Sequence, residues 1–219
     1  MTTAPAPAVP RSLLAFSIFY GGMVCIAGVL GNKQVALGPL AVEAGIFAFL
    51  MLVITSSAVA ELFDRETANR LVLIGFVPLI ASMLLIELVL LLPASPSMAD
   101  ERLAGFQLIL GSSPRLMLGG IIAYGTSQFL NVTIFSHLRR ETGRMLWLRA
   151  GIASILSQII DTLLFITIAF YGVFPIGELL LGQMLAKVVL SAVMVPPLIY
   201  LFVAIGRKLD SRAPETISG

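Results

Sequence analysis

The chain has 219 residues, of which 58% are hydrophobic and only 12% are charged, and its mean hydropathy is +1.00. A water-soluble domain of this length could not bury so much apolar surface, so the expected solvent for most of the chain is the lipid bilayer. The formal net charge is only +2, and the basic residues are spread over short polar segments rather than gathered in one patch, which argues against a nucleic acid as partner.

Apolar runs long enough to cross a membrane recur along the sequence. A helix needs about 20 residues to cross a hydrocarbon core of ~30 Å, so the runs predict an all-α integral membrane protein, a bundle of six transmembrane helices. Residues 1–12 are expected to form a disordered N-terminus, 13–206 the transmembrane domain and 207–219 a short tail. The loop from Pro93 to Arg102 has room for an interfacial turn or short helix. The six predicted spans are residues 13–37, 40–60, 70–92, 115–138, 148–171 and 176–206.

The basic residues at or beyond the ends of the spans predict the orientation in the membrane. Positive residues are enriched in cytoplasmic loops, and if the spans alternate in direction, ten basic residues fall on one face and three on the other. We therefore expect both termini in the cytoplasm. The ten are Arg11, Arg65, Arg70, Arg139, Arg140, Arg144, Arg149, Arg207, Lys208 and Arg212, and the three are Lys33, Arg102 and Arg115.

Two charged residues fall inside the last two predicted spans. Asp161 lies about 13 residues before the predicted apex near Phe174, and Lys187 about 13 residues after it. At 1.5 Å per helical residue both lie ~20 Å from the apex and thus at the same depth. A charge at the centre of a membrane helix costs at least ~2.5 to 3.5 kcal/mol, so it normally faces a partner or a water-filled cavity. We predict a functional pair, with purely structural interhelical contact as the alternative.

Polar and aromatic residues recur at helical spacing in the last three predicted spans. Each set forms one stripe on an otherwise apolar helix, and three such stripes predict one shared cavity. Hydrogen bonds that only hold helices together are the alternative. The stripes are Tyr124, Gln128, Asn131 and Phe135 in the fourth span, Ser154, Gln158, Asp161 and Phe165 in the fifth, and Gln183, Lys187 and Ser191 in the sixth.

Further polar residues mark the two ends of the predicted bundle. Asn32 and Lys33 end the first span and Glu43 begins the second, so these three are candidates for the outer part of a site. At the cytoplasmic end, Glu61 and Arg139 are expected to be solvated loop charges, like most of their neighbours. Sequence signatures of metalloproteases, serine hydrolases and nucleotide-binding loops are absent, and the single cysteine offers no metal-ligand spacing. The sequence thus predicts no enzyme, no cofactor and no metal site.

Several stretches carry a resemblance to a known family. The most specific runs from Ser127 to Arg139, a second from Trp147 to Phe170, and a third comprises Lys187, Pro196 with Pro197, and Tyr200. In these stretches the chain resembles the queuosine-precursor transporters of the vitamin-uptake-transporter group, which are bacterial proteins of about this length with six spans. The resemblance covers roughly residues 30–203. It implies a multi-pass protein of the bacterial inner membrane that imports 7-deazaguanine bases, preQ0 or preQ1.

The candidate substrate-binding residues suit such a base. Its N–H/NH2 edge can be accepted by a carboxylate, its oxygen can accept from amides or a lysine, and its face can stack on an aromatic ring. Either Glu43 or Asp161 could accept the N–H/NH2 edge, and the depth of Asp161 favours the latter. The candidates are Asn32, Lys33, Glu43, Tyr124, Gln128, Asn131, Gln158, Asp161, Phe165 and Lys187.

Three classes of function stay open at this point. The first is a free-standing transporter of a small deazapurine base. The second is a substrate-binding membrane subunit energised by a separate ATP-driven module, for which the small residues Ala27 and Gly31 could form a docking stripe. The third, a structural protein without a ligand, is disfavoured by the three polar stripes. The sequence does not decide whether the chain acts alone or as a homodimer, or whether a coupling ion or facilitated diffusion drives transport.

Overall fold

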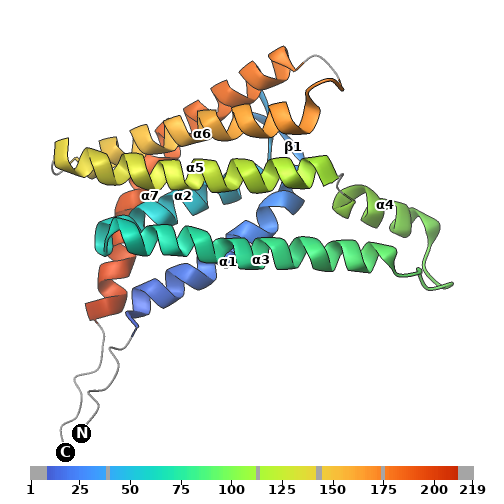
Figure 1. Cartoon of the computed structure of the whole chain (residues 1–219), viewed down its shortest axis with the longest axis horizontal. Coiled ribbons are helices and arrows are strands. Elements are labelled where there is room, and N and C mark those ends of the chain that lie inside the picture. Colours follow the sequence, from blue (N-terminus) through green and yellow to red (C-terminus); the bar gives the residue numbers. More distant parts are fainter. Residues whose placement is uncertain (1–8, 38–39, 112–113, 142–144, 174–175, 212–219) are drawn as a thin grey trace, which may run out of the picture.

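The computed structural model describes residues 9–37, 40–111, 114–141, 145–173 and 176–211. Most of the predicted terminal segments 1–12 and 207–219 lies outside the described residues, as do Phe174, Arg144 and Arg212. Within the described residues the elements, in chain order (Figure 1), are α1 (Arg11–Gly31), β1 (Gln34–Leu37), β2 (Leu40–Glu43), α2 (Gly45–Leu62), α3 (Arg65–Leu91), α4 (Asp100–Leu110), α5 (Pro114–Glu141), α6 (Leu146–Phe170) and α7 (Gly177–Ser211).

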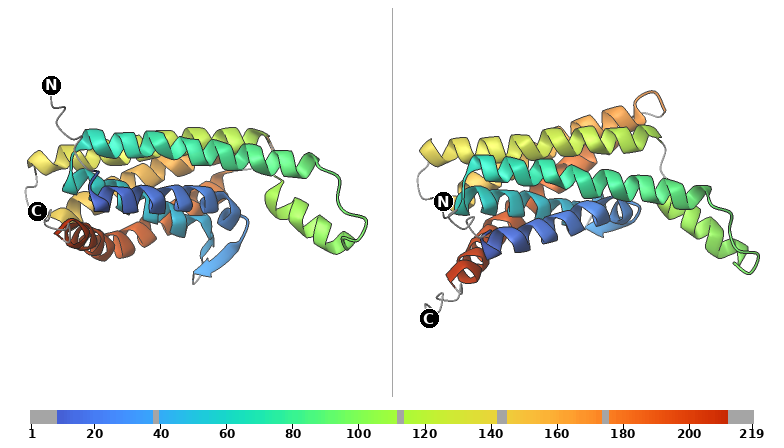
Figure 2. Two further views of the ribbon diagram at one scale, coloured as in Figure 1. Left: turned by 90° about the horizontal axis from the view of Figure 1, so that it is seen from below. Right: turned by 60° about the horizontal axis from the view of Figure 1, so that its bottom comes forward.

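Long apolar helices dominate the structure, and each of the six predicted spans coincides with one of them, namely α1, α2, α3, α5, α6 or α7. In the described part of the chain, five of these six are individually long and apolar enough to cross a membrane, and α5 meets that criterion together with α4. The prediction of an all-α membrane protein is therefore confirmed. A turn or short helix is predicted between Pro93 and Arg102; the helix that forms, α4, begins only at Asp100, continues to Leu110 and projects from the bundle (Figure 2).

A small β-hairpin replaces the predicted ends of the first two spans. β1 and β2 pair antiparallel with Gln34 opposite Glu43, and the Ala44 N–H donates to the Lys33 carbonyl at 2.8 Å. The prediction that helix continues to residue 37 and resumes at residue 40 was therefore wrong. The sequence between the strands contains Gly38 and Pro39, two residues that disfavour a continuous helix.

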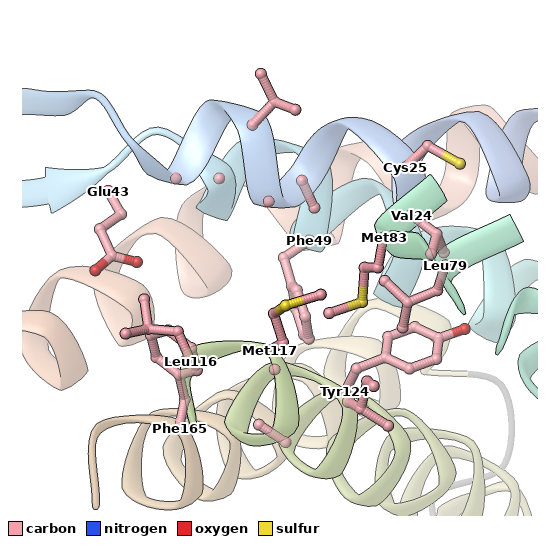
Figure 3. Close-up of a pocket in the computed structure, with 18 of the residues that line it drawn as sticks. Val24, Cys25, Glu43, Phe49, Leu79, Met83, Leu116, Met117, Tyr124 and Phe165 are labelled. Atoms are coloured by element: carbon pink, nitrogen blue, oxygen red, sulfur yellow. The ribbon is translucent and has the colours of Figure 1, made fainter. Parts of the chain in front are cut away.

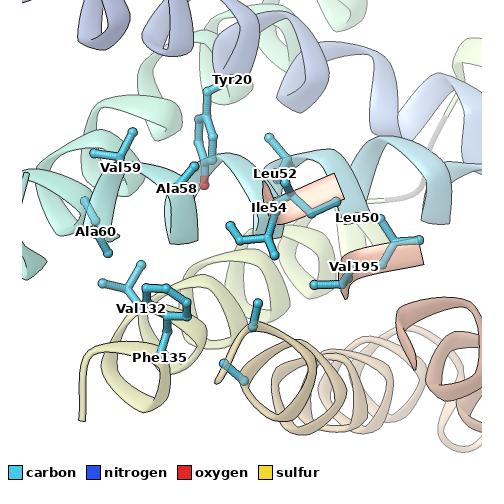
Figure 4. Packing of buried hydrophobic residues seen from close by; sticks show 14 of the residues in the cluster. Tyr20, Leu50, Leu52, Ile54, Ala58, Val59, Ala60, Val132, Phe135 and Val195 are labelled. Carbon is cyan, nitrogen blue, oxygen red and sulfur yellow. The ribbon is translucent and has the colours of Figure 1, made fainter. Parts of the chain in front are cut away.

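The central helix of the bundle is α2, which packs against α1, α3, α5 and α7. All its residues from 52 to 60 are buried, and Figure 4 shows Leu50 and Ile54 of α2 near Val195 of α7. By contrast, the second half of α3 exposes leucines such as Leu84 and Leu88, as expected for a helix that faces lipid. The hydropathy of the two helices is similar, so their neighbours, not their composition, separate core from lipid contact.

Both ends of the described chain lie at one end of the bundle, which we call the termini end. The Ser12 backbone N–H donates to Asp210 at 2.9 Å, and the Ser12 hydroxyl donates to the same carboxylate at 2.6 Å. The β-hairpin lies at the opposite end, which we call the hairpin end (Figure 1). This arrangement agrees with the prediction that both termini share one face of the membrane, whereas the assignment of that face to the cytoplasm stays a prediction.

Candidate functional site

A cavity of about 290 Å³ occupies the half of the bundle nearest the hairpin. It lies between α1, α2, α3, α5, α6 and α7, and extends to the exposed residues Asn32 and Ile109 at the hairpin end. Much of its wall is apolar, and Figure 3 shows Phe49, Met83 and Met117 among the lining side chains. We call this space the central cavity.

Six of the ten predicted site residues line the central cavity. Lys33 does not, because its side chain is exposed outside it. Gln128, Asn131 and Gln158 do not line it either; they are fully buried and follow nearer the termini end along α5 and α6. The six lining residues are Asn32, Glu43, Tyr124, Asp161, Phe165 and Lys187.

The predicted pair of charges is present across the contact of α6 with α7. The Lys187 ammonium donates to Asp161 Oδ2 at 3.0 Å, and the Ser127 hydroxyl donates to Asp161 Oδ1 at 3.3 Å. Only 5% of the Asp161 surface is exposed. Each carboxylate oxygen thus has a donor, as a charge in a low-dielectric interior requires. The pair is part of the cavity wall, and both oxygens of Asp161 are already engaged by donors of the protein.

Glu43 ends β2 and brings a second carboxylate into the central cavity. Figure 3 shows its side chain on the same side of the cavity as Leu116 and Phe165. It interacts electrostatically with both Lys187 and Asp161, but within the described residues no hydrogen bond to its carboxylate is formed. The hairpin is what positions it, because the register places Glu43 at the base of the strand, directly before α2. Its two oxygens are therefore available to a ligand.

Tyr124 forms the floor of the cavity towards the termini end, and Tyr20 packs behind it. The Tyr124 hydroxyl lies 3.1 Å from the Tyr20 hydroxyl and 3.1 Å from the Val72 carbonyl oxygen, and the Tyr20 hydroxyl donates to Gln128 Oε1 at 3.4 Å. The side chains fit because position 75 is glycine: a Cβ on Gly75 would overlap the Tyr124 hydroxyl and contact the Tyr20 ring. The aromatic floor thus connects the cavity to the buried amide of Gln128.

Beneath the cavity lies a set of buried polar residues that we call the polar layer: Gln128, Asn131, Ser154, Gln158 and Ser191. The Asn131 amide donates to the Val53 carbonyl oxygen at 3.3 Å and to Ser57 at 3.1 Å. Within the described residues, however, every member of the layer keeps at least one buried polar atom without a partner. A buried polar atom without a partner normally costs ~1 to 3 kcal/mol. The described residues of the layer thus offer more hydrogen-bonding groups than they satisfy among themselves.

Comparison with known proteins agrees with this geometry. A helical membrane bundle that encloses a mostly apolar cavity with a few polar and charged groups defines a protein that handles a small polar solute. The chain matches the family described as "Putative vitamin uptake transporter" over residues 43–202, and it belongs to that family of multi-pass membrane transporters. Transport rather than enzymatic catalysis is therefore its class of activity, as the absence of catalytic motifs predicts.

A curated relative gives a more specific name. The chain is 29% identical over 184 residues to a "Probable queuosine precursor transporter" from Bacillus subtilis (strain 168), a match that covers 82% of this chain and 80% of that protein. No solved structure matches the chain. The family resemblance identified from the sequence motifs is thus confirmed.

Proposed function

We propose that the chain imports a queuosine precursor, a 7-deazaguanine base such as preQ0 or preQ1, through the central cavity. The relative's name suggests the substrate class, and the size of the cavity suits it, since about 290 Å³ is close to the lower limit of the ~300 to 1,000 Å³ typical of small-molecule sites. Mostly apolar walls with a few polar groups are what a flat, polar-edged base requires.

The observation that carries the proposal is the free carboxylate of Glu43. A deazaguanine presents N1–H and the 2-amino group side by side, and one carboxylate accepts both in a charge-assisted pair. Sequence depth favours Asp161 for this role, but both of its oxygens already accept hydrogen bonds. We therefore assign recognition of the base to Glu43, with the Phe165 ring on the same side of the cavity as a stacking surface.

The ion pair and the polar layer then have separate tasks. Lys187, held by Asp161, is a donor for the base oxygen, and the atoms without partners in the polar layer are hydrogen-bond groups for the path towards the termini end. Entry is from the hairpin end, where the cavity reaches exposed residues. Release requires the bundle to rearrange around α2, because the residues from 52 to 60 between the cavity and the termini end are buried.

Contacts between α1 and the start of α2 weaken the alternative of an externally energised subunit. The small residues Ala27 and Gly31, which could have formed a docking stripe, are covered by the start of α2: a Cβ on Gly45 would lie 2.7 Å from the Ala27 carbonyl oxygen and 3.2 Å from Gly31. The stripe therefore serves packing within the chain, and a free-standing transporter is the better proposal.

Uptake of labelled preQ0 and preQ1 by cells that lack their own importer and any vitamin-energising module tests the proposal. We expect accumulation with the wild-type chain, and reduction by at least about tenfold with Glu43→Gln, since an amide turns one acceptor into a donor facing a donor of the base. The matched control is Glu87→Gln on α3, which lies outside the cavity lining. Equal uptake by the two variants, or none by wild type, would refute the proposal.

A further inference from the structure

A second cavity, of about 660 Å³, lies at the termini end and shares no lining residue with the central cavity. Four helices meet there, because α2 and α5 end, α6 begins and α7 approaches its end. We call it the basic cavity. Its lining residues are Glu61, Arg139, Leu146, Arg149, Tyr200, Val203, Ala204 and Arg207.

The described lining of the basic cavity carries a surplus of positive charge. Three guanidinium groups, of Arg139, Arg149 and Arg207, face one carboxylate, that of Glu61. Arg139 and Arg207 are exposed at the mouth, whereas Arg149 is only 2% exposed. A buried guanidinium is unfavourable unless acceptors surround it, so the surroundings of Arg149 decide what the cavity can hold.

Arg149 is incompletely satisfied by the protein. Its Nη2 donates to Glu61 Oε2 at 2.8 Å, and its guanidinium carbon lies 4.9 Å from the centre of the Phe135 ring. Its Nε and Nη1 are buried and have no acceptor among the described residues. An oxyanion ligand would supply acceptors to these two nitrogens, which carry three N–H bonds, on the wall of a cavity that two more arginines flank.

We propose that the basic cavity binds a phosphate group, either that of an anionic lipid headgroup or that of a dissolved phosphate ester. Guanidinium groups match phosphate geometry through paired N–H donors, and basic pockets between membrane helices are known headgroup sites. The exposed apolar residues Leu201 and Ile205, neighbours of the lining residues on α7, offer a surface for the acyl chains of a lipid. The site is independent of the proposed substrate, because no residue of the central cavity takes part.

The test uses the purified full chain in a neutral detergent. Its thermal stability is measured with added phosphatidylglycerol or phosphatidylcholine, and separately with inorganic phosphate or chloride at equal ionic strength. The variant is Arg139→Gln with Arg207→Gln, because both residues are exposed at the mouth and their loss should not impair folding, unlike that of buried Arg149. The charge-matched control is Arg70→Gln with Arg102→Gln, two exposed arginines outside the cavity lining.

We expect stabilisation by phosphatidylglycerol over phosphatidylcholine, with an apparent affinity lowered at least about tenfold in the double mouth variant and unchanged in the control. Stabilisation by phosphatidylglycerol alone identifies a headgroup as the ligand, and stabilisation by inorganic phosphate over chloride identifies a dissolved phosphate; either supports the site. No preference for either phosphate source, or equal behaviour of the two double variants, would overturn it.

Discussion

The two cavities of this bundle treat buried charge in opposite ways. In the central cavity, Lys187 and Asp161 pair at 3.0 Å and a single carboxylate, that of Glu43, is left without a hydrogen bond from the described residues. In the basic cavity the excess charge has the opposite sign, and two guanidinium nitrogens of Arg149 have no acceptor among the described residues. The comparison teaches that the unpaired group, rather than the paired one, indicates what a membrane cavity is built to receive.

The largest expected effect comes from breaking the pair in the central cavity. Asp161→Asn or Lys187→Met alone leaves one buried charge without its counter-ion, which costs ~3 to 5 kcal/mol, so the thermal stability of each single variant in detergent should fall sharply. The double variant should be more stable than either single one and yet fail in uptake, because Lys187 is lost as a donor. Wild-type uptake by the double variant would reduce the pair to a structural contact.

A second pair of variants compares the buried ion pair at the basic cavity with an exposed ion pair on α3. Glu61→Gln removes the only described acceptor of Arg149, whose side chain is 2% exposed, and should destabilise by about 3 kcal/mol. Glu66→Gln removes the partner of Arg70, and because both side chains are more than two-thirds exposed, the change should be within ~1 kcal/mol. Thermal unfolding of both variants at one salt concentration checks this, and similar losses would contradict the burial argument.

A smaller effect is expected from adding a methyl group at Gly75, beneath the central cavity. Gly75→Ala places a Cβ against the Tyr124 hydroxyl and the Tyr20 ring, and such overpacking typically costs ~1 to 3 kcal/mol. Binding of the base should weaken as well, since the cavity floor must shift. Gly22→Ala is the control, because nothing lies within 4 Å of its added Cβ. If both variants unfold at the same temperature and bind the base with the same affinity, a glycine at position 75 is not required to fit the two tyrosines.

The smallest effect concerns an exposed charge at the termini end. Asp64 caps α3 by accepting from the Thr67 N–H at 2.6 Å, and this backbone hydrogen bond lowers the pKa of its carboxyl. A carboxyl whose pKa is lower in the folded state stabilises the fold at pH values above its unfolded-state pKa. This stabilisation is lost as the pH falls through the folded-state pKa. Asp64→Ala should therefore cost ~1 kcal/mol at neutral pH, with the difference from wild type shrinking below about pH 4. A difference that grows on acidification would reverse the assigned sign.

Sequence patterns predicted the helices well because hydropathy alone identifies apolar runs of membrane length. They failed at the hairpin, because the apolar residues on either side of Gly38 and Pro39 extend the two hydropathic runs although residues 34–37 and 40–43 pair as strands. Lys33, predicted as a site residue because it lies at the end of the first span, is exposed and does not line the central cavity. Hydropathy also does not tell the central α2 from the lipid-facing part of α3.

Within the site, the sequence predicted the relative position of residues along neighbouring helices better than it predicted which residues line the cavity. Matched distance from an apex was enough to pair Asp161 with Lys187, but helical spacing alone placed Gln128 and Gln158 in the cavity when they lie buried below it. Arg149 was counted among the loop charges although its position, one residue inside a predicted span, was a signal of burial. Glu61, expected to be solvated, is its partner. Such pairings depend on which helices are neighbours, and one sequence does not contain that information.

Competition binding to the purified chain tests whether the Glu43 carboxylate accepts hydrogen bonds from the paired donors of a guanine-like base. Labelled preQ1 is displaced by guanine-type and adenine-type analogues in wild type, Glu43→Gln and Asp161→Asn. We expect a guanine preference in wild type that is lost in Glu43→Gln, with guanine-type affinity lowered at least about tenfold, and retained in every Asp161→Asn sample that stays folded. An unchanged guanine preference in Glu43→Gln would contradict the claim.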